Sequence, residues 1–133
     1  GDMHVEITVG PERAARMSPS GSAVRRGLRF TIHNDATVTP TLPLHLMWCA
    51  VNRTTTSGVK LDGNQCITPM QALRAHTQDA AWQVFLDHER GSIETGKRAD
   101  FVILSENPLD NPSGLKDITV EQTVVQGKRV FQL

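Results

Sequence analysis

The stretch Gly91–Leu104, GSIETGKRADFVIL, separates two parts of the chain with different residue patterns. It opens with polar residues and glycines and closes on the compact apolar run Phe101–Leu104, which predicts a buried strand. Further on, Ile118–Val125 and Lys128–Phe131 flank Gln126-Gly127, which is typical of a tight two-residue hairpin. We therefore predict that the chain ends in a small antiparallel sheet.

The residues before Gly91 are mostly helical in pattern. The apolar residues of Leu44–Val51 recur at i, i+3, i+4 and i+7, which predicts an amphipathic helix. Thr68-Pro69-Met70-Gln71 combines an N-cap threonine, an N1 proline and a capping-box glutamine, so a long helix should begin there and pause near Asp79. Shorter helices are expected over Glu12–Met17 and Ser20–Arg26.

Two other segments alternate apolar and polar residues, which predicts strands over Val5–Val9 and Leu28–His33. The second segment ends in His33-Asn34-Asp35, so polar side chains stand at the carboxyl end of a predicted strand. A carboxylate in that place can bind a divalent cation or accept a proton from metal-activated water. The alternatives are an Asx turn or cap for Asp35 and a packed strand histidine for His33.

The totals exclude several classes of function. A length of 133 residues suits one domain, and 14 basic against 14 acidic side chains provide no positive excess for a nucleic acid. No apolar run is long enough for a membrane helix. No signal-peptide pattern opens the chain, so we expect a cytoplasmic protein. Cys49 and Cys66 are expected to be reduced thiols rather than a disulfide.

Three stretches together resemble the urease-like, metal-dependent amidohydrolase superfamily. Thr77–Pro108, which contains GSIETGKRADFVIL, is similar to the passage from the family's barrel into its small β-sandwich. Gly27–Pro40, GLRFTIHNDATVTP, is similar to the eighth barrel strand with its terminal aspartate. Ile118–Phe131, ITVEQTVVQGKRVF, is similar to the closing hairpin. With Gly10–Ala14, GPERA, the pattern is most similar to the branch of N-substituted formamide deformylases.

The resemblance implies an α+β chain: the C-terminal piece of a (β/α)8 metallo-hydrolase barrel over residues 1–90, then a β-sandwich segment over 91–133, in one compact unit. It implies hydrolysis of a non-peptide C–N bond in a small molecule, namely an amide, an N-formyl amine or a cyclic amide. Asp35 is then the expected metal ligand or general base, His33 and His4 are the expected substrate contacts, and zinc is the expected divalent metal.

The chain also departs from the family pattern. It contains no HxH pair, which supplies metal ligands in the family, and a complete barrel needs about 250 residues. We therefore expect this chain alone to bind no metal and to be inactive. The alternative function is a non-catalytic association module derived from an amidohydrolase scaffold. In either case we expect a homo-oligomer that uses Leu28–Ile32 or Leu44–Val51, without a nucleic-acid or membrane partner.

Overall fold

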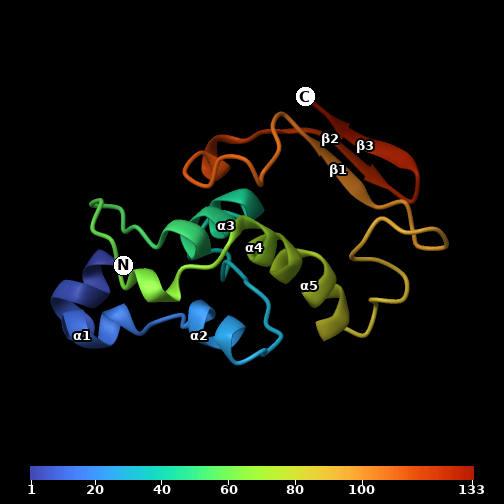
Figure 1. Ribbon diagram of the computed structural model, residues 1–133. Coiled ribbons are helices and arrows are strands. Elements are labelled where there is room, and N and C mark those ends of the chain that lie inside the picture. The colour runs from blue at the N-terminus through green and yellow to red at the C-terminus, as the bar shows by residue number, and fades with distance from the viewer.

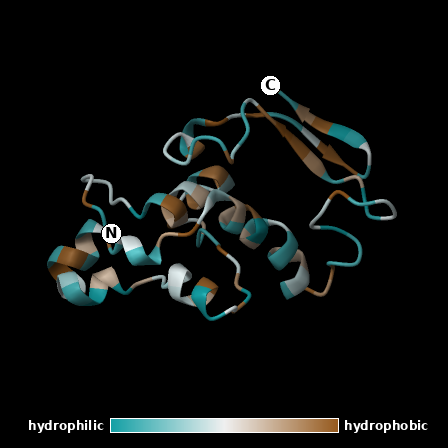
Figure 2. Ribbon diagram, in the orientation of Figure 1, coloured by the Kyte–Doolittle hydropathy of each residue, from teal (hydrophilic) through white to brown (hydrophobic).

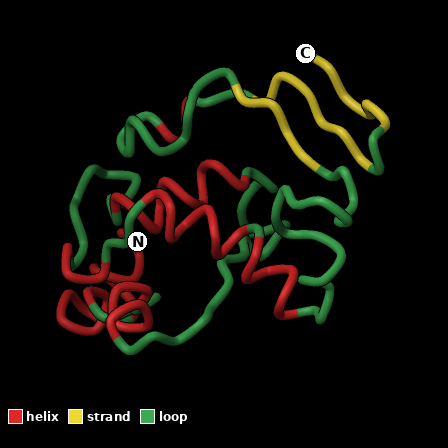
Figure 3. The backbone as a smooth tube through the Cα atoms, turned by 45° about the vertical axis from the view of Figure 1, so that its right-hand side comes forward, coloured by secondary structure: helices red, strands yellow, loops and turns green.

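The computed structural model describes all residues 1–133, with helices in the first two thirds and a three-stranded sheet at the end (Figure 1). Figure 3 shows the strands gathered at one end of the molecule and the helices at the other. The chain is thus an α+β unit, as predicted. Its elements are η1 His4–Thr8, α1 Gly10–Ala15, α2 Ser20–Arg25, α3 Pro43–Asn52, η2 Gly63–Gln65, α4 Pro69–His76, α5 Gln78–Gln83, β1 Phe101–Leu104, η3 Leu115–Asp117, β2 Val120–Val125 and β3 Lys128–Gln132.

The two central helices are present where the sequence predicts helices, and α3 includes the predicted range Leu44–Val51. Pro43 is the first residue of α3 and Pro69 the first of α4, because a helix's first turn needs no partner for the amide that proline lacks. Thr68 and Gln71 form the predicted capping box: the Gln71 amide donates to Thr68 Oγ1 at 3.2 Å, and the Thr68 amide donates to Gln71 Oε1 at 2.8 Å. Both predictions are confirmed.

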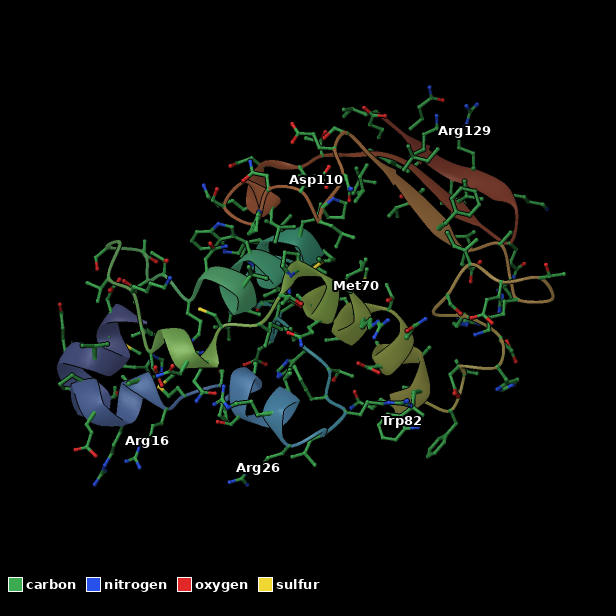
Figure 4. The ribbon with its side chains drawn as sticks, viewed as in Figure 1. Arg16, Arg26, Met70, Trp82, Asp110 and Arg129 are labelled. Atoms are coloured by element: carbon green, nitrogen blue, oxygen red, sulfur yellow. The ribbon has the colours of Figure 1, made fainter.

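The hydrophobic core joins these helices to the segment that precedes β2. Its buried members come from α3, α4 and η3 and from the residues beside them: Met47, Ile67, Ala72, Leu115 and Ile118. Only 12 of the 133 residues are buried, so the core is small for a chain of this length. Large apolar side chains are left outside it, among them Met70 on α4 and Trp82 on α5, which are 42% and 43% exposed (Figure 4).

The C-terminal sheet is antiparallel, in the order β1-β2-β3. The predicted turn joins β2 and β3: Gln126 and Gly127 have φ values of 52° and 75°, and two successive positive φ values define the hairpin turn that matches strand twist. The hairpin prediction is confirmed, although β2 starts at Val120 because Ile118 belongs to the core.

The prediction that Phe101–Leu104 is a buried strand is wrong: three of its residues are exposed and Leu104 is only half-buried. Phe101, Val102 and Ile103 are 38%, 51% and 41% exposed, and every residue of β3 is exposed. Side chains alternate between the faces of a strand, so the successive apolar residues of β1 make both faces of the sheet apolar. The sheet extends away from the helices (Figures 1 and 2), and this chain therefore supplies too few residues to cover both faces.

Two local predictions near the helices are corrected. Val5–Val9 is not a strand: His4–Thr8 is a π-helical turn, in which the Val9 amide donates to the His4 carbonyl at 3.1 Å. Five alternating residues were too short a pattern to outweigh the helical surroundings that continue into α1. The long helix breaks at Thr77 rather than Asp79, where the Thr77 hydroxyl donates to the Leu73 carbonyl at 2.8 Å.

Leu28–His33 is the most informative correction. The segment is extended after Gly27, which has a φ of 66°, but it forms no strand ladder. The amides of residues 29–34 and the carbonyls of residues 29–33 make no hydrogen bond within the chain. Phe30 and Ile32 still pack against the core. A strand requires a neighbouring strand for its backbone groups, and these 133 residues place none beside it.

Candidate functional site

The candidate site begins at the end of this extended segment, where a hydrogen-bonded loop covers residues 33–40. The Asn34 side-chain amide donates to the Pro40 carbonyl at 2.8 Å, and the Thr39 hydroxyl donates back to the Asn34 carbonyl. The Val38 amide donates to the Asp35 carbonyl at 2.8 Å. Asp35 lies at the turn with a φ of 49°, in the left-handed region that aspartate adopts more readily than most residues. The loop therefore has a defined shape.

His33 and Asp35 meet within this loop through the backbone. The Asp35 amide donates to Nδ1 of His33 at 3.2 Å. The Asp35 carboxylate itself is exposed and makes no hydrogen bond or ion pair within the chain. A free carboxylate at this place can still act as a metal ligand or proton acceptor, but it can also be a solvated turn residue.

An open cavity of about 640 Å³ lies beside His33. Its walls come from the 33–39 loop, from α3, from residues 17–20 and from the loop after α3. His33 and Thr39 contribute from the first loop, and His45, Cys49 and Arg53 contribute from α3 and its C-cap. The volume falls within the range of small-molecule sites. Asp35 and His4 do not line it.

His4 stands apart from His33 and Asp35 in the chain, on the π-helical turn η1. It is half-buried, and its Nδ1 atom is buried without a hydrogen-bond partner. The structure therefore brings two of the three predicted site residues, His33 and Asp35, into one loop and leaves His4 on a separate element.

Arg53 carries a charged side chain, yet it is only 8% exposed. It is the left-handed C-cap of α3. Its guanidinium donates to the carbonyls of Ala15, Met17 and Ser18 at 3.2, 2.9 and 3.0 Å. These carbonyls belong to the last residue of α1 and to residues just after it, and a cation is favourable at the C-terminal end of a helix. Arg53 therefore ties one wall of the cavity to another. No sequence pattern singled it out, because its acceptors are backbone atoms.

The cysteine on the cavity wall is not poised as a nucleophile. Burial raises the pKa of the Cys49 thiol, which favours the protonated form. Its sulfur lies 3.7 Å from Nε2 of His45, one turn earlier on α3. Cys49 and Cys66 are both free, as predicted.

The chain's own residues do not make up a metal centre. No group of three or more histidine, cysteine, aspartate or glutamate side chains is arranged to hold an ion. Asp35 offers one carboxylate, and structural or catalytic zinc needs at least three protein ligands. A divalent metal at this place would therefore require ligands from outside these 133 residues.

The chain is an α+β unit that ends in an antiparallel hairpin. Comparison with known proteins assigns its family. The model of the amidohydrolase family matches residues 1–131. The chain belongs to the amidohydrolase family.

Curated relatives agree with this assignment. The chain is 34% identical over 113 residues to an N-substituted formamide deformylase from Arthrobacter pascens, which covers 84% of the chain and 21% of the relative. It is 25% identical over 128 residues to the putative amidohydrolase YtcJ from Bacillus subtilis, covering 93% of the chain and 24% of the relative. It is 36% identical over 128 residues to the protein LONG AFTER FAR-RED 3 from Arabidopsis thaliana, covering 92% of the chain and 21% of the relative. The chain thus spans between a fifth and a quarter of these relatives.

Solved structures share the fold. An amidohydrolase from Thermotoga maritima superposes with a TM-score of 0.62 at 22% identity, over 96% of this chain and 27% of that structure. A putative prolidase from Bifidobacterium longum superposes with a TM-score of 0.66 at 27% identity, over 85% of this chain and 25% of that structure. None of the helices in the present chain is long and apolar enough to cross a membrane.

Proposed function

We propose that this chain is the C-terminal portion of a metal-dependent amidohydrolase that hydrolyses a C–N bond other than a peptide bond. The observation that carries the proposal is the free Asp35 carboxylate in the loop after the extended segment Leu28–His33, in a chain that is 34% identical to an N-substituted formamide deformylase. An N-formyl amine is the first substrate class to test, and amides and cyclic amides follow because their C–N bonds call for the same attack by water.

Asp35 is the residue proposed to take part in the chemistry, as a metal ligand or as a proton acceptor. His33 is proposed to contact the substrate because it lines the cavity next to Asp35. His4 is kept as a weaker substrate contact, since it would have to reach the site from η1. Zinc is the first metal to test, with its other ligands supplied from outside these residues.

The division of the chain supports the same proposal. Residues 1–90 hold all the α-helices and the strand-like segment, and are proposed to be the end of the barrel. Residues 91–133 hold the three paired strands, and are proposed to belong to the β-sandwich. The apolar residues exposed on both faces of the sheet are expected of a segment that packs between other layers.

Substitution of Asp35 tests this function. The polypeptide encoded by the whole reading frame around these residues should hydrolyse an N-substituted formamide, and Asp35→Asn should lower kcat by about 10²–10⁴-fold. Asp87→Asn, at an exposed position in the loop after α5, is the matched control and should keep the wild-type rate. The 133-residue chain alone should show no turnover with or without zinc. Full activity of Asp35→Asn would contradict the proposal.

A second candidate, a non-catalytic association module, is favoured by one observation: within Leu28–Ile32, the backbone of residues 29–32 makes no hydrogen bond, and the Leu28 side chain is 59% exposed. Such an edge can pair with a second copy of the chain. The other expected surface, Leu44–Val51, packs within its own chain as part of α3, so the homo-oligomer proposal now depends on Leu28–Ile32. Sedimentation equilibrium should detect a dimer, and a monomer at every concentration would reject it.

A further inference from the structure

The hydrogen bond between the Asp35 amide and the His33 ring fixes which ring nitrogen carries the proton. A backbone N–H can only donate, so Nδ1 of His33, at 3.2 Å, must accept through its lone pair. A neutral imidazole carries a single N–H. The proton of neutral His33 therefore lies on Nε2.

The loop holds the ring in this arrangement. The Asn34 side chain and the Thr39 hydroxyl close the loop across residues 34–40, and the Val38 amide bonds the Asp35 carbonyl. The direction of the Asp35 amide is thereby set by three other hydrogen bonds. Nε2 of His33 has no partner within the chain, and the side chain lines the 640 Å³ cavity.

This arrangement argues against a metal-ligand role for His33. Histidines that bind metals nearly always donate their second ring N–H to a carboxylate, carbonyl or water. In His33 the second nitrogen accepts a hydrogen bond instead, so ligation through Nε2 would require a ring with no proton at all. The same proton on Nε2 prevents that atom from acting as a general base. Nε2 of neutral His33 can therefore act as a hydrogen-bond donor.

We propose that His33 is a substrate-orienting residue that donates its Nε2–H to the carbonyl oxygen of a neutral amide or formamide. This inference rests on the proposed function, because the carbonyl belongs to the substrate of that reaction. A donor aimed at this oxygen would also stabilise the negative charge that develops there when water attacks the carbonyl carbon. The site therefore favours a ligand with an oxygen acceptor over one with an ammonium group.

The first test uses the 133-residue chain itself. Long-range ¹H–¹⁵N correlation spectra of the imidazole rings, at a pH where His33 is neutral, distinguish the protonated from the unprotonated nitrogen. The expected result is a protonated Nε2 and an unprotonated Nδ1. A protonated Nδ1, or an even mixture of the two tautomers, would overturn the inference while leaving the amidohydrolase proposal intact.

The second test uses two matched substitutions in the polypeptide of the whole reading frame, with N-methylformamide as substrate. His33→Gln can place an amide N–H near the position of Nε2, whereas the shorter side chain of His33→Asn can place its oxygen acceptor near Nδ1 but no donor near Nε2. We expect His33→Asn to lower kcat about 10²–10³-fold, as loss of an oxyanion donor does, and His33→Gln to lower it by about tenfold or less. Bound zinc should be unchanged in both.

Equal losses in the two variants, or loss of zinc from either, would overturn the donor role. If the wild-type polypeptide hydrolyses no formamide or other amide, the proposed function fails and the substrate contact fails with it. The tautomer measured in the isolated chain then separates the two failures, because it depends on the loop alone.

Discussion

Helices α3 and α4 and the segment Leu28–His33 meet the same core but differ in how their backbones are satisfied. The helices bond their own carbonyls and amides, and Thr68 and Gln71 cap the start of α4. The extended segment packs Phe30 and Ile32 onto the core, yet residues 29–33 make no backbone hydrogen bond. The difference teaches that a helix satisfies its backbone groups within its own residues, whereas an extended segment needs a neighbouring strand that this chain does not place beside Leu28–His33.

The sheet β1-β2-β3 differs from the extended segment in the opposite way, because its backbone is hydrogen-bonded while its side chains lack a covering layer. Its hydrogen bonds are formed, but its apolar residues, which colour parts of its ribbon brown in Figure 2, are largely exposed. Side-chain packing and backbone hydrogen bonding therefore occur separately in different parts of this molecule. The effect of a substitution on stability can be attributed to one or the other.

The largest expected effect is on core packing. Leu115 is fully buried, whereas Val130 on β3 is 62% exposed. Leu115→Ala should lower the free energy of unfolding by about 2–5 kcal/mol, because it removes buried methyl groups and leaves a cavity. Val130→Ala should change it by about 0.5 kcal/mol or less. Urea unfolding followed by tryptophan fluorescence measures both, and equal losses would show that the sheet is covered in solution.

The next effect concerns Arg53, which joins α3 to the residues after α1. Arg53→Met removes three hydrogen bonds from a charged donor and should cost about 2–3 kcal/mol. Arg53→Lys keeps the charge but not the fork of donors, so it should recover only part of that loss. Amide exchange should speed up selectively around Ala15–Ser20. Wild-type stability in Arg53→Met would contradict this role.

A pH dependence should arise from His76 on α4. Burial lowers its pKa, partly offset by a hydrogen bond with the Ala72 carbonyl, and Nε2 is buried without a partner. The unfolded chain therefore binds the proton more tightly than the folded chain. Stability should be full above about pH 6.5 and should decline as the pH falls from there through the lowered pKa of the folded state.

His76→Gln should remove this decline, whereas His88→Gln, at an exposed position, should leave it in place. Unfolding free energies measured from pH 8 to pH 5 provide the comparison. If the unfolding free energy of His76→Gln fell with pH as steeply as that of the wild type, other titrating groups would be the cause.

The smallest expected effect is a gain in stability on substitution of Phe85. Phe85 has a φ of 60° and is 83% exposed, so its side chain contributes little burial while its backbone lies where a Cβ atom is disfavoured. Phe85→Gly should raise stability by about 0.5–1 kcal/mol, after allowance for the greater freedom of glycine in the unfolded chain. Phe85→Ala keeps the Cβ atom and should show no such gain. A stabilised Phe85→Ala variant would attribute the effect to removal of the ring.

The sequence predicted the features whose causes are local. The capping box at Thr68, the helix over Leu44–Val51 and the turn at Gln126-Gly127 all depend on a few neighbouring residues, and all three are confirmed. The family was also predicted correctly from Gly91–Leu104 and two other stretches.

Features that depend on distant residues were not predicted. Leu28–His33 has a strand's residues but no neighbouring strand, and β1 has a buried strand's residues but no covering layer. Burial of Arg53 depends on carbonyls 35–38 residues earlier in the chain. The roles of Asp35, His33 and His4 remain predictions.

Amide hydrogen exchange of residues 29–33 tests the central claim most directly. In the isolated chain these amides should exchange about as fast as in an unfolded peptide, while the interiors of α3 and α4 are protected. In the polypeptide of the whole reading frame, the same amides should become as slow as those of the core, because strands pair with both edges. Slow exchange in the isolated chain, or fast exchange in the longer polypeptide, would contradict the account of Leu28–His33 as a barrel strand without its partners.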